Sequence, residues 1–149
     1  MLTEGIEKAM IQVGEDARKG IEKLIEGKSR LFKDSNLAHR TINILGTDYT
    51  IKRQSKEDNP KLDNAWGLCE GYKKEIIVDT FDEEKKNVMA VDNFEGFEKK
   101  VLRHEIIHAF LGESGLKSNS DWAENEEMVD WFAIQATKIF KVFKELGVI

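Results

Sequence analysis

Apolar residues recur at steps of three and four over residues 2 to about 26, and this period predicts an amphipathic helix. Gly27 follows the last apolar residue and is a suitable end for that helix. Because a helix with one apolar face must cover that face, we expect it to pack either on the rest of the chain or on another chain. We assign residues 1–38 to an N-terminal helical segment. Its apolar positions are Leu2, Ile6, Ala9, Met10, Val13, Ala17, Ile21, Leu24 and Ile25.

The next part of the chain carries short β-branched runs separated by turn residues, which is typical of strands. Residues 41–51 predict a β-hairpin with its turn at 46–48, Gly-Thr-Asp. Residues 65–79 predict a second hairpin with its turn at 71–74. The polar segment 55–64 between them contains Asn-Pro and is expected to be a loop.

Two longer helical patterns follow the strands. The first runs from about residue 94 to 113, and the second from about 122 to 146 with Ser120 or Asp121 as its N-cap. The order of elements predicts an α+β fold, in which an N-terminal helix precedes a short antiparallel or mixed sheet of three to four strands and two further helices. Residues 39–149 would form one domain.

The composition indicates a globular protein. Hydrophobic residues make up 40% of the 149 residues and charged residues 34%, a balance that excludes a wholly disordered chain. No apolar run approaches the roughly 20 residues that cross a bilayer, and the net charge of −5 gives no attraction to nucleic acid. We therefore expect neither a membrane nor a nucleic acid as partner. The first residues are acidic where a signal peptide is basic, and Cys69 is the only cysteine, so a cytoplasmic location is expected.

Residues 104–108, His-Glu-Ile-Ile-His, form an H-E-x-x-H motif inside the first of the two helical patterns. Residues four apart lie on the same face of a helix, so the imidazoles of His104 and His108 can bind one metal ion. Glu105 is rotated by about 100° from His104 and can reach a water molecule beside the metal, a position that suits a general base. Two imidazoles on a buried face need polar partners, and a metal ion supplies one for both.

Two histidines leave a tetrahedral metal ion without a third protein ligand, and Glu126 is our candidate. It lies at the edge of the apolar stripe of the last helix, three residues before Val129, where a carboxylate is unfavourable unless it is paired or bound to metal. Asp130, one turn later, can accept a hydrogen bond from the outer N–H of a ligand histidine. In the alternative interpretation Glu126 and Asp130 belong to a solvated acidic face. Cys69 and His39 are less suitable ligands because they lie far upstream.

Three segments together resemble a small gluzincin-type metallopeptidase, and more specifically the ImmA/IrrE-like peptidases of bacterial phages and mobile elements. They are the H-E-x-x-H motif, Gly-Glu-Ser-Gly-Leu at 112–116, and Glu-Glu-Met-Val-Asp-Trp-Phe-Ala at 126–133. The resemblance covers roughly residues 40–145 and implies a small zincin-like domain that binds zinc. The implied zinc ligands are His104, His108 and Glu126, and the implied catalytic residue is Glu105.

The resemblance implies a zinc-dependent metallopeptidase in which Glu105 is the general base. Members of the family cut regulators of gene expression, so the implied partner is a peptide or protein substrate such as a transcriptional regulator. An extended substrate could add to the free edge of the strand at 75–79, and Tyr72 is a weak candidate for a second oxyanion donor. Two other hypotheses stay open: a catalytically silent zinc-binding module that acts by protein recognition, and a structural zinc domain.

Overall fold

The computed structural model describes residues 40–82 and 93–149. The chain divides into two compact units, Met1–Ser35 and Asn36–Ile149, and all the described residues belong to the second unit. The predicted N-terminal helical segment and His39 lie outside the described residues.

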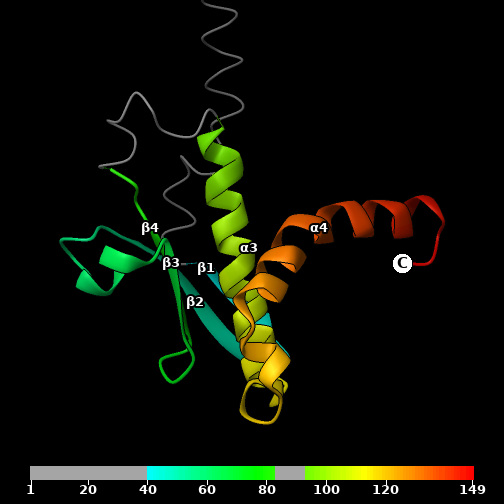
Figure 1. Ribbon diagram of the computed structural model, residues 1–149, viewed down its shortest axis with the longest axis horizontal. Helices are drawn as coiled ribbons and strands as arrows, with labels where there is room; N and C mark the ends of the chain where they lie inside the picture. The colour runs from blue at the N-terminus through cyan, green and yellow to red at the C-terminus, as the bar shows by residue number, and fades with distance from the viewer. Residues whose placement is uncertain (1–39, 83–92) are drawn as a thin grey trace, which may run out of the picture. The chain divides into compact units, whose positions relative to one another are not determined.

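Four strands form one mixed sheet with the order β1-β2-β4-β3 (Figure 1). They are β1 Arg40–Ile44, β2 Thr47–Gln54, β3 Gly67–Glu70 and β4 Glu75–Asp79. β1 pairs with β2 and β3 pairs with β4, each antiparallel, whereas the central strands β2 and β4 run parallel. The two predicted hairpins are therefore present, and the parallel pair joins them into one sheet.

The first hairpin turns at Leu45 and Gly46, one residue earlier than predicted. Leu45 has φ +50° and Gly46 has φ +92°, as in a two-residue type I′ turn, whose twist matches that of the flanking strands. The register places Ile44 opposite Thr47, and the Asn43 side chain accepts a hydrogen bond from the Gly46 N–H at 3.0 Å. The sequence did not indicate a turn that begins at Leu45, because a leucine at positive φ is unfavourable by roughly 1–2 kcal/mol.

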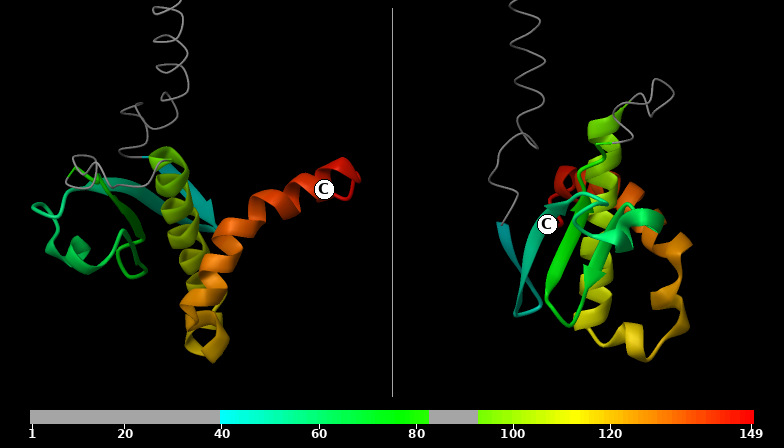
Figure 2. Two further views of the ribbon diagram at one scale, coloured as in Figure 1. Left: turned by 45° about the horizontal axis from the view of Figure 1, so that its top comes forward. Right: turned by 90° about the vertical axis from the view of Figure 1, so that its left-hand side faces the viewer.

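Helix α3 (Phe94–Glu113) packs on the sheet and carries the H-E-x-x-H motif (Figure 2). Its bounds are those predicted, and the Asn93 side chain caps it by accepting a hydrogen bond from the Gly96 N–H at 2.9 Å. The buried face of the helix meets the strands in an apolar core, where each fully buried aliphatic side chain contributes roughly 1.5–3 kcal/mol. The buried members of this core are Ile44, Tyr49, Ile51, Ile76 and Ala109.

The last residue of α3 ties the helix to the sheet. The Glu113 carboxylate accepts hydrogen bonds from the Thr47 hydroxyl at 2.8 Å and the Tyr49 hydroxyl at 2.7 Å, and it forms an ion pair with Lys74. These donors, of which Lys74 is the strongest, lower the pKa of Glu113 to about 2. Because the donors come from β2 and from the turn before β4, they restrict rotation of α3 about its axis and so help to set where its histidines point.

Helix α4 (Glu126–Glu145) begins four residues later than predicted. Asn125 takes an extended conformation (ψ 111°) and caps the helix, because its side chain accepts a hydrogen bond from a backbone N–H of the first turn. The predicted caps, Ser120 and Asp121, stand instead at the start of a 3₁₀ turn, Asp121–Glu124. The boundary matters for the site because it makes Glu126 the first residue of the helix.

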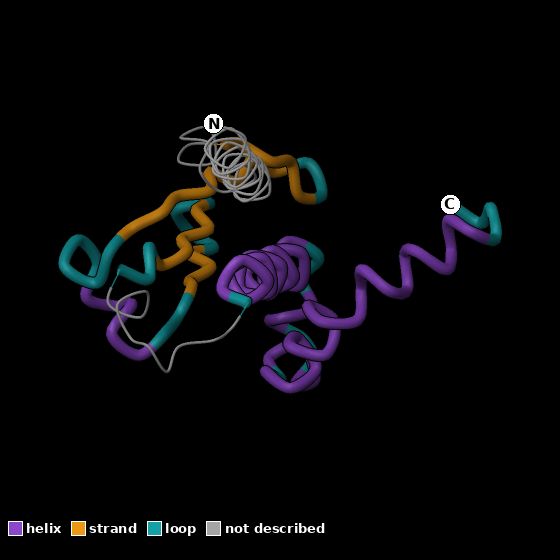
Figure 3. Tube along the Cα trace, turned by 90° about the horizontal axis from the view of Figure 1, so that it is seen from above, coloured by secondary structure: helices purple, strands orange, loops and turns teal. Residues whose placement is uncertain are grey.

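The first half of α4 packs on α3, so that α3 lies between the sheet and α4 (Figure 3). Val129 and Ala133 are the buried residues of α4, and the Arg103 Nε–H donates a hydrogen bond to the Ala133 carbonyl at 2.5 Å. The start of α4 thereby lies beside the motif of α3. The predicted α+β class is confirmed, and no helix in the described part of the chain is long and apolar enough to span a membrane.

Candidate metal centre

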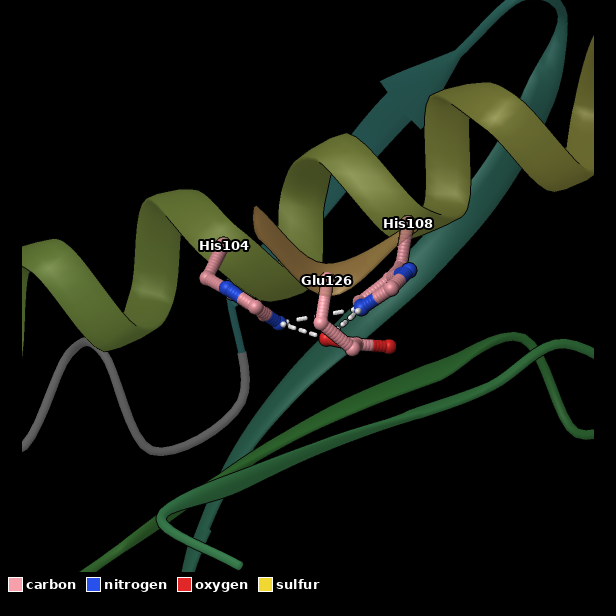
Figure 4. A group of neighbouring side chains, drawn as sticks. All are labelled: His104, His108 and Glu126. Carbon is pink, nitrogen blue, oxygen red and sulfur yellow. Dashed lines mark hydrogen bonds and ion pairs between the residues drawn. The ribbon is translucent and has the colours of Figure 1, made fainter. Parts of the chain in front are cut away.

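Two histidines of α3 extend from one face of the helix toward the same point (Figure 4). His104 and His108 are one turn apart, and their Nε2 atoms lie 3.0 Å from each other. Both side chains are mostly buried, with 17% and 11% of their surface exposed. Their convergence agrees with the geometry expected from the four-residue spacing.

Glu126 completes a cluster of three side chains (Figure 4). Its Oε2 atom lies 3.0 Å from His104 Nε2 and 3.3 Å from His108 Nε2. Ligands that bind zinc at about 2.0–2.1 Å in a tetrahedron lie about 3.3–3.4 Å from one another, which is close to these separations. The structure therefore brings the three predicted ligand atoms to the spacing that one small cation requires.

Asp130 determines which nitrogen of His104 carries the proton. Its Oδ1 atom lies 2.7 Å from His104 Nδ1 and 2.7 Å from Lys100 Nζ. Partial burial acts to raise the pKa of Asp130, but hydrogen bonds from Lys100 and His104 outweigh it and lower that pKa. The carboxylate is thus ionised at neutral pH and can only accept hydrogen bonds. A neutral His104 therefore carries its proton on Nδ1 and presents a lone pair on Nε2.

The lone pair of His104 faces two further electron-pair donors, the carboxylate of Glu126 and the ring of His108. Burial is the main cause that lowers the pKa of His108, which favours its neutral form, and within the described residues its buried Nδ1 atom has no hydrogen-bond partner. Donors that face one point repel each other unless a cation lies between them. One proton can be shared by two of these atoms, whereas a metal ion accepts a lone pair from all three.

Glu105 lies in the same cleft but outside the cluster. Only 6% of Glu105 is exposed to solvent, and this burial raises the pKa of its carboxyl group to about 8. The negative charge of Glu126 adds to the rise, and the positive charge of Lys117 opposes it. The side chain packs on Gly67 of β3, where an added Cβ atom would lie 2.8 Å from Glu105 Cγ. Glycine at this position leaves the space that the carboxyl group occupies. A carboxyl group with this pKa can take up and release a proton near neutral pH, and a bound cation would lower the pKa.

The cluster lines a cleft of about 430 Å³ bounded by β3, α3 and the start of α4. Several of its lining residues, among them Gly67, Lys100 and Lys117, were not predicted from the sequence. Lys100 precedes His104 by four positions, and this spacing is a signal that could have placed it on the same helix face. Gly67 and Lys117 carry no such signal, because tertiary packing alone brings their segments to the cleft.

One expectation about the substrate side of the cleft is wrong. Strand β4 is paired on both sides, with β2 and with β3, so it has no free edge for a peptide. Within the described residues the edge strand beside the cleft is β3. Tyr72 is fully exposed in the turn between β3 and β4, and it does not line the cleft of the cluster. Cys69 does line that cleft, but it does not belong to the cluster of His104, His108 and Glu126.

No family model matches the chain, and comparisons with curated proteins and with solved structures gave no match. The features that indicate a function are therefore the three-residue cluster, the buried carboxyl group beside it and the cleft that holds both.

Proposed function

We propose that the protein is a zinc-dependent metallopeptidase with a zincin-like domain, related to the ImmA/IrrE-like peptidases. The observation that supports this most strongly is the convergence of His104 Nε2, His108 Nε2 and Glu126 Oε2 beside the buried carboxyl group of Glu105. Burying the carboxyl group of Glu105 is unfavourable, and a site that only stored a metal ion would not need such a group beside it.

The donor set fits zinc. Two imidazoles and one carboxylate are ligands that zinc commonly takes in hydrolytic sites, where they leave one coordination position for water or substrate. Asp130 and Lys100 keep the His104 ring oriented, with its Nε2 atom facing His108 and Glu126, the two residues that would hold the cation with it. When bound, zinc supplies a Lewis acid that lowers the pKa of water and polarises a carbonyl group.

Glu105 acts as the proton carrier of the reaction. It takes a proton from a water molecule as the water oxygen attacks the carbonyl carbon of the peptide, and it delivers that proton to the amine nitrogen as the C–N bond breaks. Gly67 leaves room for the carboxyl group to approach the backbone of β3. The carboxyl group thus sits between the metal ligands on α3 and the strand along which we place the substrate.

The substrate binds in an extended conformation along β3. The Trp66 carbonyl accepts a hydrogen bond from the Asp79 N–H at 3.0 Å, so the backbone groups of Trp66 point toward the chain of β4. In an antiparallel pair every second residue points its backbone groups the other way. Gly67 and Cys69 therefore turn theirs away from β4. Those groups are available to pair with an added peptide strand. The family resemblance favours regulatory proteins, such as a transcriptional regulator, as the source of that peptide.

Metal analysis combined with a cleavage assay tests the proposal. Protein purified without added metal is analysed for zinc and incubated with a mixture of synthetic peptides, which is then examined by mass spectrometry. We expect roughly one zinc ion per chain and chelator-sensitive cleavage for the parent. His108→Ala should lose most of the zinc, and Glu105→Gln should keep zinc but lose cleavage.

Glu124→Gln, which alters an exposed carboxylate in the preceding turn, is the matched control and should behave like the parent. Zinc in the parent without cleavage of any peptide would contradict the proposal and favour the silent recognition module. A parent without zinc would contradict both.

A further inference from the structure

Lys117 is a cation of the cleft that the proposed reaction does not use. It lies in the 3₁₀ turn Leu116–Ser118 after α3, and it lines both the cleft and an adjoining hollow of about 1010 Å³. Lys100, the other lysine of the cleft, is paired with Asp130 at 2.7 Å. In the part of the chain that the structure describes, Lys117 has neither a hydrogen bond nor an ion pair.

Backbone geometry and one side-chain hydrogen bond hold the turn that carries Lys117, whose own side chain is exposed. The turn begins at Gly115, whose φ of +76° is left-handed, and the Asn119 side chain closes it by donating a hydrogen bond to the Gly115 carbonyl at 2.7 Å. Burial raises the pKa of Glu105 on α3 and of Cys69 on β3, and the positive charge of Lys117 opposes both rises. Lys117 and Cys69 both line the cleft and the adjoining hollow, so Lys117 lies where the two meet, beside β3.

The other charges of the cleft limit what Lys117 can bind. An ammonium group without a partner is suited to an anionic group of a ligand. Three carboxyl groups, those of Glu105, Glu126 and Asp130, line the same cleft and would repel a ligand that carries several negative charges. A single carboxylate is the anion that this arrangement fits best.

The distance along β3 places that carboxylate relative to the reacting bond. Gly67 is next to Glu105, and Cys69, which lines the cleft and the hollow together with Lys117, is two residues further along the strand. Two residues of a strand span about 6–7 Å. An extended peptide on β3 would therefore present to Lys117 a group within about two residues of the bond that Glu105 serves.

We propose that Lys117 binds a carboxylate of the substrate within about two residues of the bond that is cut. The inference depends on the proposed peptidase function. The carboxylate belongs either to an aspartate or glutamate side chain or to the C-terminus of the peptide, and these sources differ in whether the cut falls inside the peptide or close to its end.

Charge reversal at Lys117 tests the proposal with the zinc-loaded protein. A mixture of synthetic peptides is digested by the parent, by Lys117→Glu and by Lys144→Glu, an exposed control in the last turn of α4. The parent and the control should cut peptides with an acidic residue near the cut roughly three- to fivefold faster than matched lysine peptides. Lys117→Glu should reverse that preference. If the C-terminus is the source, amidation of the peptides should remove the parent's preference instead.

A binding measurement separates this inference from the proposed function. Fluorescein-labelled alanine peptides that differ only in one aspartate or lysine, with free or amidated C-termini, are titrated with zinc-loaded Glu105→Gln protein, with and without Lys117→Glu. Lys117→Glu should weaken binding of the carboxylate-bearing peptides and leave zinc affinity unchanged. A parent that cuts peptides with no preference for a carboxylate would overturn the inference and leave the peptidase proposal standing. A parent that cuts nothing would overturn the peptidase proposal, and the binding data alone would then decide the role of Lys117.

Discussion

Replacing Glu105 with glutamine is expected to remove much of the pH dependence of stability that the metal-free protein shows between about pH 4.5 and pH 8. Burial, together with the charge of Glu126, raises the pKa of Glu105 from 4.5 to about 8 in the folded protein. Between these pH values the folded chain binds the proton of Glu105 and the unfolded chain does not. The free energy of unfolding therefore falls as the pH rises, because the ionised carboxyl group must be buried above about pH 8.

The size of this effect follows from the two pKa values. One pKa unit corresponds to about 1.4 kcal/mol, so the penalty is on the order of 5 kcal/mol when the pH exceeds the folded pKa, and it is absent below the unfolded pKa. Burial lowers the pKa of His108, so His108 acts in the opposite sense and costs stability as the pH falls. Because His108 is present in both proteins, the difference between the parent and Glu105→Gln isolates Glu105.

Urea unfolding in the presence of a chelator, repeated from pH 5 to pH 9, measures this difference. The free energy of unfolding of Glu105→Gln should exceed that of the parent by an amount that grows with pH, while the exposed control Glu124→Gln should follow the parent. Saturating zinc should reduce the difference, because a nearby cation favours the ionised carboxyl group. Identical pH dependence of the parent and Glu105→Gln would refute the argument that Glu105 is buried in a place that opposes its charge.

Gly67→Ala is expected to lower kcat by roughly tenfold or more with zinc retained, because the new methyl group would displace the Glu105 carboxyl group; an unchanged kcat would show that this packing has no role. Asp130→Asn should weaken zinc binding by about 10- to 100-fold in competition with a chelating dye, since His104 loses its charged acceptor, and equal affinity would contradict that role. Phe81→Ala should cost roughly 3–5 kcal/mol in urea unfolding, because Phe81 is fully buried among aromatic rings; a loss below 1 kcal/mol would mean that the cluster is loosely packed.

Local patterns in the sequence were sufficient to predict the bounds of α3 and the presence of α4, the two helices that hold the cluster. The bounds of α3 agree with the structure because its apolar period and its cap are properties of neighbouring residues. The juxtaposition of His104, His108 and Glu126 was predicted from helical periodicity. The second reason, the cost of a carboxylate near an apolar face, does not hold, because the Glu126 side chain is 69% exposed. Asp130 was placed by the same reasoning, one turn after Glu126, and it contacts His104 as expected.

Features that depend on long-range packing were not predictable in the same way. Which hairpin strand becomes central depends on the parallel pairing of β2 with β4, and no local pattern encodes that pairing. The start of α4 was misjudged because residues 121–124 follow a helical pattern yet form only a 3₁₀ turn before Asn125 ends it. Gly67 and Lys117 reach the cleft from segments far from the motif in sequence.

X-ray absorption spectroscopy at the zinc edge, on the zinc-loaded parent, tests the central claim most directly. We predict a shell of nitrogen and oxygen atoms at about 2.0–2.1 Å, with the outer-shell scattering of two imidazoles and no sulfur. In Glu126→Gln the shell should change while both imidazole signals persist. A sulfur ligand at about 2.3 Å, which would come from Cys69, or the signal of fewer than two imidazoles would contradict the claim that His104, His108 and Glu126 bind one metal ion.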